Sequence, residues 1–153
     1  LCINPMYANL FMEIPPLRYE SLADVRGFVR RSDYLVTTDD KSGYHNLLLH
    51  PSMFRVSAIR FRGVTYYYRA MAFGYAPACH AYSLLKQETY RPLRAVGVDL
   101  AYLIDDCLLA ARSLARARFL ARGQAELLTA LGFTLSPGKC QLVPAQRARF
   151  LLK

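Results

Sequence analysis

Two adjacent carboxylates, Asp105 and Asp106, stand between two apolar runs of the sequence. The runs cover residues 98–104 and 107–111, and each is short and aliphatic enough to form a buried strand. Two like charges at the tip of an apolar hairpin repel each other and contribute nothing to packing. A divalent cation between them removes that repulsion, because Mg²⁺ prefers hard oxygen ligands.

A further acidic pair, Asp39-Asp40, ends another apolar segment much earlier in the chain. One carboxylate after a strand, together with an Asp-Asp pair at a later hairpin tip, is the arrangement of a two-metal nucleotidyl transferase. The alternative interpretation is that each acidic pair is a solvated turn that binds no metal.

The segments that must position these residues predict an α+β domain. A capping box at Ser21 predicts a helix to about Arg31, and Ser113 predicts a second N-cap. The remaining elements are expected at 34–38 (strand), 55–69 (hairpin), 77–90 (helix), 98–111 (the Asp-Asp hairpin), 113–131 (helix), and 133–136, 141–143 and 150–152 (short strands), after an irregular segment 1–17.

With the 55–69 hairpin set aside as an insertion, the order of elements is β-α-β-β-α-β. This is the ferredoxin-like split βαβ pattern, an antiparallel sheet with helices on one face. Its first and second strands run parallel, so their carboxyl ends share one edge of the sheet. Asp39 ends the first strand and Asp105-Asp106 the second, so the topology alone predicts that these carboxylates meet.

The residues around the carboxylates resemble the motifs of reverse transcriptases. Five motifs occur in the family's order: the first catalytic motif at 39–45, the PFG loop at 71–77, YxDD at 103–106, the following motif at 131–140 and FLG at 150–152. The Asp-Asp-Lys-Ser-Gly-Tyr form of the first motif and residues 144–147 lean toward DIRS-like, tyrosine-recombinase retrotransposons. The resemblance implies a polymerase palm and RNA-directed DNA polymerase activity.

The resemblance also implies a metal site. Asp39 and Asp105 would bridge two Mg²⁺ ions, with Mn²⁺ as a possible substitute, and Asp106 would be a weaker or outer ligand. The backbone carbonyl of Asp40 would complete the nucleotide-side ion. The family usually has an apolar residue at this position, so we expect the Asp40 side chain to face solvent or a basic neighbour.

Four residues are expected to contact the incoming nucleotide. Tyr44 matches an aromatic steric gate that excludes a 2′-hydroxyl, although a core aromatic is the alternative. Phe73 and Gly74 match the loop that packs on the nucleotide, and Lys139 matches a lysine proposed to protonate pyrophosphate, with a solvated turn lysine as the alternative.

The sequence departs from the family pattern at three places. Leu103 replaces the tyrosine of YxDD and, with Ile104, would lie near the primer terminus. The loop 74–77 is shorter than usual, and the glycine of FLG is absent at 150–152. These departures keep open an alternative function, a decayed retroelement remnant that retains the palm fold and binds nucleic acid without catalysis.

The domain organisation is expected to be a partial fingers segment at 1–32 and a palm at 33–153, with the 55–69 hairpin as a fingers-side insertion. The thumb and RNase H regions of a larger polyprotein are expected to be missing, so the isolated fragment is expected to be inactive. The expected partners are an RNA/DNA primer–template and a dNTP.

The composition fits these expectations. The chain has 153 residues, 54% of them hydrophobic, which suits one domain with a real core. The formal charge of +9 favours a polyanionic partner, although a solubilising surface charge is equally compatible with it. No apolar run approaches the roughly 18 residues of a membrane span, so no membrane partner is expected. Four cysteines without CxxC spacing suggest free thiols and an intracellular location.

Overall fold

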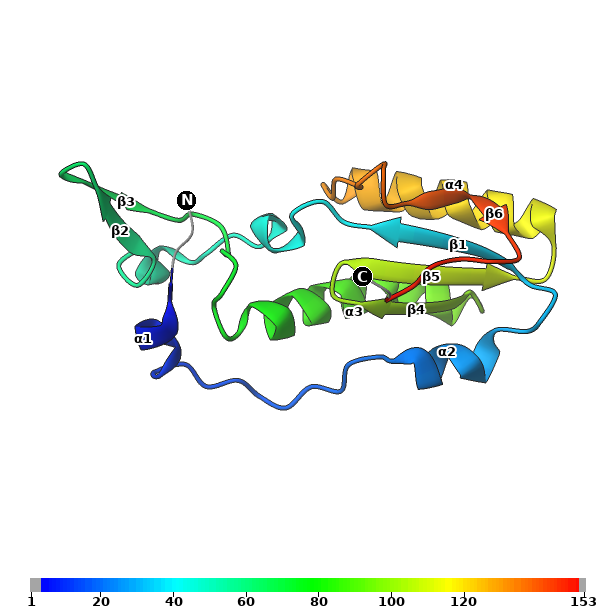
Figure 1. Ribbon diagram of the computed structural model, residues 1–153, viewed down its shortest axis with the longest axis horizontal. Coiled ribbons are helices and arrows are strands. Elements are labelled where there is room, and N and C mark those ends of the chain that lie inside the picture. The colour runs from blue at the N-terminus through cyan, green and yellow to red at the C-terminus, as the bar shows by residue number, and fades with distance from the viewer. Residues whose placement is uncertain (1–3, 152–153) are drawn as a thin grey trace.

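The computed structural model describes residues 4–151 and contains a four-stranded antiparallel sheet in the order β4-β5-β1-β6. The strands are β1 (Tyr34–Asp39), β4 (Asp99–Leu103), β5 (Asp106–Ala111) and β6 (Gln141–Ala145). Because β1 and β4 are both antiparallel to β5, they run in the same direction, as Figure 1 shows. The predicted ferredoxin-like sheet is therefore confirmed.

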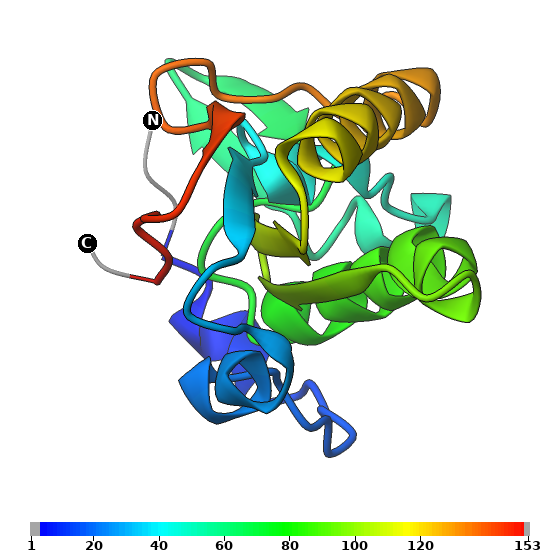
Figure 2. The ribbon, with the colours of Figure 1, turned by 90° about the vertical axis from the view of Figure 1, so that its right-hand side faces the viewer.

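Two long helices cover one face of this sheet (Figure 2). They are α3 (Ala78–Ala95) and α4 (Leu114–Ala130), and Ser113 caps α4 by accepting a hydrogen bond from the Arg116 N–H at 3.2 Å. Aliphatic side chains of the strands, such as Val36 and Leu109, are fully buried beneath the helices. None of the helices in the described part of the chain is long and apolar enough to cross a membrane.

A separate hairpin, β2 (Ala58–Phe61) and β3 (Val64–Tyr67), projects from the far end of the molecule (Figure 1). Arg62 and Gly63 form its turn with φ values of 49° and 79°, as a type I′ hairpin turn requires. The hairpin lies within the predicted limits. Two 3₁₀ helices, Gly43–Asn46 and Pro51–Met53, connect β1 to it.

The N-terminal segment packs against both ends of the domain. Helix α1 (Met6–Asn9) interrupts the described part of the segment 1–17, which is otherwise irregular as expected, and the Asn9 amide donates to the Gly74 carbonyl and accepts from the Ala76 N–H, both at 2.9 Å. Helix α2 (Leu22–Phe28) begins at the predicted capping box on Ser21. Glu20 accepts a hydrogen bond from the Tyr102 N–H at 2.9 Å, so this segment lies along the edge strand β4.

Further sequence predictions about elements were wrong. Within 133–136 only Leu135 pairs, in an isolated bridge with Asp40, because a turn at Ser136 follows at once. Residue 152 lies outside the described residues, and the strand expected at 150–152 does not form at residues 150 and 151. Leu151 has a φ of 58°, which is incompatible with an extended backbone. Helix α3 continues beyond 90 to Ala95, although Pro92 lies inside its last turn and cannot donate the hydrogen bond to the carbonyl four residues earlier.

Candidate active site

The three predicted catalytic carboxylates belong to one end of the sheet. The register pairs Asp39 of β1 directly with Asp106 of β5, and Asp106 pairs on its other side with Leu103. Asp105 lies in the turn between β4 and β5, and its carbonyl accepts a hydrogen bond from the Asp40 N–H at 3.0 Å. Directly opposed residues project their side chains from the same face of a sheet, so Asp39 and Asp106 are neighbours.

The turn that carries Asp105 is strained. Ile104 and Asp105 are its two central residues, and Ile104 has a φ of 54° whereas Asp105 has a negative φ. This combination matches a type II′ turn, whose first position favours glycine. A β-branched residue there is a genuine outlier, worth roughly 1–3 kcal/mol of strain, and such strain is typical of functional sites.

Asp39 is 5% exposed and forms an ion pair with Lys139. The Asp39 Oδ2 atom accepts from the Lys139 Nζ atom at 3.1 Å, and its Oδ1 atom is buried without a hydrogen-bond partner among the described residues. The hydrogen bond and charge of Asp39 raise the pKa of Lys139, and the charges of Asp105 and Asp106 raise it further. Lys139 therefore lies in the combined field of all three carboxylates.

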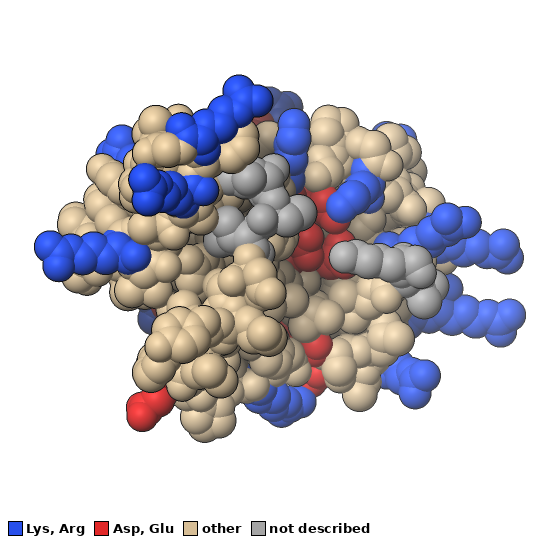
Figure 3. Space-filling model, turned by 60° about the vertical axis from the view of Figure 1, so that its left-hand side comes forward, with Lys and Arg blue, Asp and Glu red and all other residues tan. Residues whose placement is uncertain are grey.

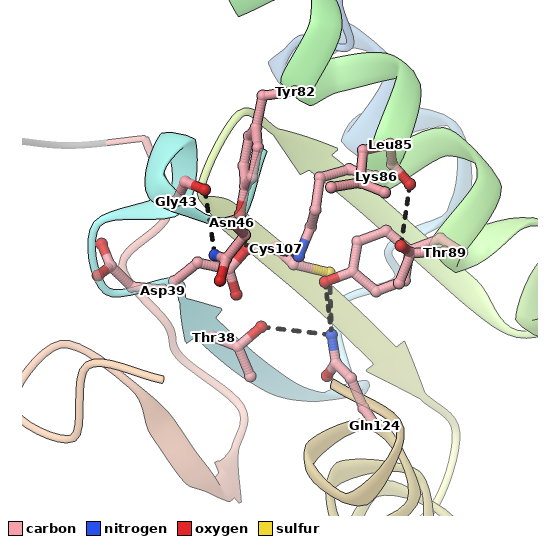
Figure 4. A network of polar contacts seen from close by, with 12 residues as sticks. Thr38, Asp39, Gly43, Asn46, Tyr82, Leu85, Lys86, Thr89, Cys107 and Gln124 are labelled. Carbon is pink, nitrogen blue, oxygen red and sulfur yellow. Dashed lines mark hydrogen bonds and ion pairs between the residues drawn. The ribbon is translucent and has the colours of Figure 1, made fainter. Parts of the chain in front are cut away.

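Asp40 directly follows β1, and its side chain lies on the opposite face of the sheet, beneath the helices. Its Oδ2 atom accepts from the Tyr82 hydroxyl at 2.6 Å and from the Lys86 Nζ atom at 2.5 Å, and all three residues are buried. Figure 4 shows Lys86 reaching inward from α3 while Asp39 points away from it. The expectation that the Asp40 side chain would face a basic neighbour is met, and only the backbone of Asp40 remains as a candidate metal ligand.

As the side chains stand, no three His, Cys, Asp or Glu residues between residues 4 and 151 converge closely enough to hold a metal ion. Two features of the site contribute to this arrangement. The Asp40 carboxylate faces the core, and the Asp39 carboxylate is engaged by Lys139. The predicted metal roles of Asp39, Asp105 and Asp106 therefore stay predictions.

The structure brings together three of the predicted nucleotide-binding residues. The ring of Tyr44 is buried against Phe73, with centroids 4.9 Å apart, and Gly74 follows with a φ of 94°. The Tyr44 hydroxyl and the Cys79 Sγ atom are 2.8 Å apart, and burial followed by this contact raises the pKa of Tyr44. Phe73 is 57% exposed, so it presents a ring to solvent beside the buried tyrosine. The steric-gate role of Tyr44 stays a prediction.

Sequence reasoning missed a buried polar network behind the carboxylates. The Lys86 Nζ atom lies 4.7 Å from the ring centroid of Tyr90 and 4.6 Å from that of Phe133. The signal was present, because Lys86 lies four residues from Tyr90 on a face of α3 that also carries Tyr82. A lysine between aromatic residues at helical spacing is a candidate for burial, but this spacing does not identify the acid that pairs with it.

Gln124 of α4 extends this network toward the sheet. Its Nε2 atom donates to the Thr38 Oγ1 atom at 3.3 Å and contacts the Cys107 Sγ atom at 3.1 Å (Figure 4). Burial raises the pKa of Cys107 to about 11, so its thiol stays protonated at neutral pH. The network joins α3, α4 and the sheet directly behind the end of β1.

The surface around the site combines both signs of charge. Figure 3 shows acidic side chains in a hollow near the middle of one face, with lysine and arginine side chains projecting around it. An acidic centre with a basic surround is what a metal-dependent site on a polyanionic substrate requires.

A family model described as reverse transcriptase (RNA-dependent DNA polymerase) matches residues 3–151, and the chain belongs to this family. No curated protein matches the sequence significantly.

Solved structures of foamy virus protease–reverse transcriptases have the same fold. One in complex with double-stranded DNA has a TM-score of 0.80 at 14% identity and covers 92% of this chain and 24% of its own. Another in complex with an RNA/DNA hybrid has a TM-score of 0.78 at 12% identity, covering 92% and 19%. The native prototype foamy virus protein has a TM-score of 0.75 at 14% identity, covering 90% and 18%. The chain therefore spans about a quarter or less of these proteins.

Proposed function

We propose that this chain is the palm of a retroelement reverse transcriptase that adds deoxynucleotides to a primer by a two-metal mechanism. The observation that supports this most strongly is the register of the sheet. It sets Asp39 opposite Asp106 and ties the carbonyl of Asp105 to the N–H of Asp40. Family membership and the foamy virus folds agree with this proposal.

The donor set fits divalent cations. Asp39 offers a buried Oδ1 atom that has no hydrogen-bond partner in the described chain, and hard carboxylate oxygens suit Mg²⁺ or Mn²⁺. Asp39 and Asp105 would hold the ions, with Asp106 as an outer ligand and the Asp40 carbonyl on the nucleotide side. When bound, two such ions activate the primer 3′-hydroxyl and stabilise the charge on the leaving pyrophosphate.

The remaining residues of the site would orient substrate and move a proton. Lys139 would move away from Asp39 if that carboxylate held an ion, because the two positive charges repel, and its ammonium group could then donate a proton to pyrophosphate. Tyr44, Phe73 and Gly74 would lie against the sugar and base of the dNTP. Leu103 would contact the primer terminus. Primer–template binding through the arginine-rich surface would weaken steeply with salt, because phosphate contacts release counterions.

A second function is a non-catalytic remnant that binds nucleic acid. The observation in its favour is that no three acidic, cysteine or histidine side chains converge on a common point among residues 4–151. Its fold and basic surface would be retained while the metal site has lost its geometry.

A chimera distinguishes the two functions. Residues 1–153 replace the palm of an active relative, and dNTP incorporation on a primer–template is measured for the chimera and for its Asp105→Asn variant. Incorporation that Asp105→Asn abolishes supports the palm enzyme. A folded chimera that binds primer–template but incorporates nothing supports the remnant.

A further inference from the structure

A fully buried ion pair lies directly behind the carboxylate site. The side chains of Lys86 and Asp40 are 0% and 1% exposed, and the Lys86 Nζ and Asp40 Oδ2 atoms are 2.5 Å apart. Desolvating two charges costs several kcal/mol per ion, so a pair of this kind is weak evidence for stability. The Oδ1 atom of Asp40 is also buried without a hydrogen-bond partner among residues 4–151.

The pair is connected to each part of the proposed site. The backbone N–H of Asp40 donates to the carbonyl of Asp105, and Asp39 is its neighbour in β1. The Asp40 carboxylate also accepts from the Tyr82 hydroxyl, and the ring of Tyr82 packs edge-on against Tyr44 at 5.6 Å. The Asp40 carboxylate therefore contacts α3, while the residue reaches the Asp105 turn through its backbone N–H and Tyr44 through the ring of Tyr82.

We infer that Asp40 and Lys86 are positioning residues, which act by fixing the end of β1 against the Asp105 turn. The effect expected on metal binding rests on the proposed function, whereas the effect expected on backbone hydrogen exchange does not. The Lys86 ammonium group also contacts the rings of Tyr90 and Phe133, so packing as well as Asp40 restrains its position. The ion pair thus holds the end of β1 against α3. The hydrogen bond from the Asp40 N–H to the Asp105 carbonyl in turn holds the β4–β5 turn against the end of β1.

Charge removal on each side tests the inference. Asp40→Asn leaves Lys86 buried without a counter-ion, and Lys86→Met leaves Asp40 in the same condition, so each single change forces the remaining charge toward water. The double variant D40N/K86M removes both charges and keeps an oxygen for the Tyr82 hydroxyl. Glu126→Gln is the matched control, because it removes one acid from an exposed ion pair with Arg122 on α4.

The first readout is amide hydrogen exchange followed by NMR, which needs no metal. If Asp40 and Lys86 position the end of β1, both single variants should accelerate hydrogen exchange at the backbone amide of residue 40 by about tenfold or more. Exchange at the Leu109 amide, in the middle of the sheet, should change less. In the double variant the exchange rate of the residue-40 amide should return to near that of the original chain. In Glu126→Gln this exchange rate should not change. Equal acceleration at both amides, or none, overturns the inference.

The second readout is Mn²⁺ affinity measured by electron paramagnetic resonance on folded protein. Positioning predicts that both single variants weaken binding, by about tenfold as is typical for residues that orient metal ligands, and that the double variant recovers it. Opposite effects of the two variants would indicate a through-space charge effect and overturn positioning, as would unchanged affinity. If the original chain binds no Mn²⁺, the proposed function fails while the exchange experiment still decides the inference.

Discussion

Gly43 is the position where one added methyl group would disturb the site most. A Cβ atom at Gly43 would lie 2.7 Å from the Cζ and hydroxyl oxygen atoms of Tyr82, well below the 3.4–4 Å of ordinary van der Waals contact. Tyr82 is fully buried and hydrogen-bonded to Asp40, so its ring cannot move away freely. Overpacking costs about 1–3 kcal/mol, and a strained hydrogen bond to a charged group adds to it, so Gly43→Ala should destabilise the fold by about 3 kcal/mol.

The assay for Gly43→Ala is equilibrium urea unfolding followed by far-ultraviolet circular dichroism, which suits a chain without tryptophan. Gly123→Ala is the matched control, because nothing lies within 4 Å of its added Cβ inside α4. Alanine in a helix interior should raise the free energy of unfolding there by about 0.5–1 kcal/mol. Gly43→Ala with a stability within about 0.5 kcal/mol of the original chain would refute the close packing of Tyr82 on this turn.

Three further variants test the turn, the buried acid and the proposed metal exchange. Ile104→Gly should cost less stability in urea unfolding than Ile104→Ala, because both remove a side chain that packs on the core but only glycine accepts the positive φ; a larger loss for glycine would refute strain at the turn. Burial alone would raise the pKa of Asp33, but its hydrogen bonds from Arg112 and the Arg30 N–H lower it overall. The resulting stability is present above the unfolded pKa of about 3.9 and is lost as pH falls through the folded pKa. Arg112→Met should therefore lower stability at pH 7, and the difference from the original chain should narrow below about pH 4 in pH-dependent melts; a difference that stays constant with pH would contradict this. Lys139→Gln should tighten Mn²⁺ binding in titrations, because it removes a positive charge 3.1 Å from Asp39, a proposed metal ligand. Weaker Mn²⁺ binding by this variant would contradict the proposal that an ion takes the place of Lys139 beside Asp39.

The sheet and its carboxylates were predictable from local patterns. Alternating or continuous apolar runs identify the strands around Asp39 and Asp105, and the β-α-β-β-α-β order brings their ends together. Capping residues such as Ser21 and Ser113 locate two helix starts, because their side chains satisfy N–H groups that the helix leaves unpaired.

The part that could not be predicted depends on contacts between distant segments. Whether Lys86 pairs with Asp40 is decided by the packing of α3 on β1, and neither residue signals the other through spacing. The absence of the expected strand at residues 150 and 151 has the same origin, since an apolar run becomes a strand only where a partner offers hydrogen bonds. Helix α1 depends on the contacts of Asn9 with the loop at Gly74 and Ala76, which lie far along the chain.

The central claim is that Asp39 and Asp105 hold divalent cations for nucleotidyl transfer. Anomalous diffraction from crystals of the chain soaked with Mn²⁺ and a dNTP tests it most directly. We predict manganese between the carboxylates of Asp39 and Asp105, at oxygen distances of about 2.1 Å, with Lys139 displaced from Asp39. Manganese bound elsewhere, or an intact ion pair between Lys139 and Asp39 at saturating Mn²⁺, would contradict the claim.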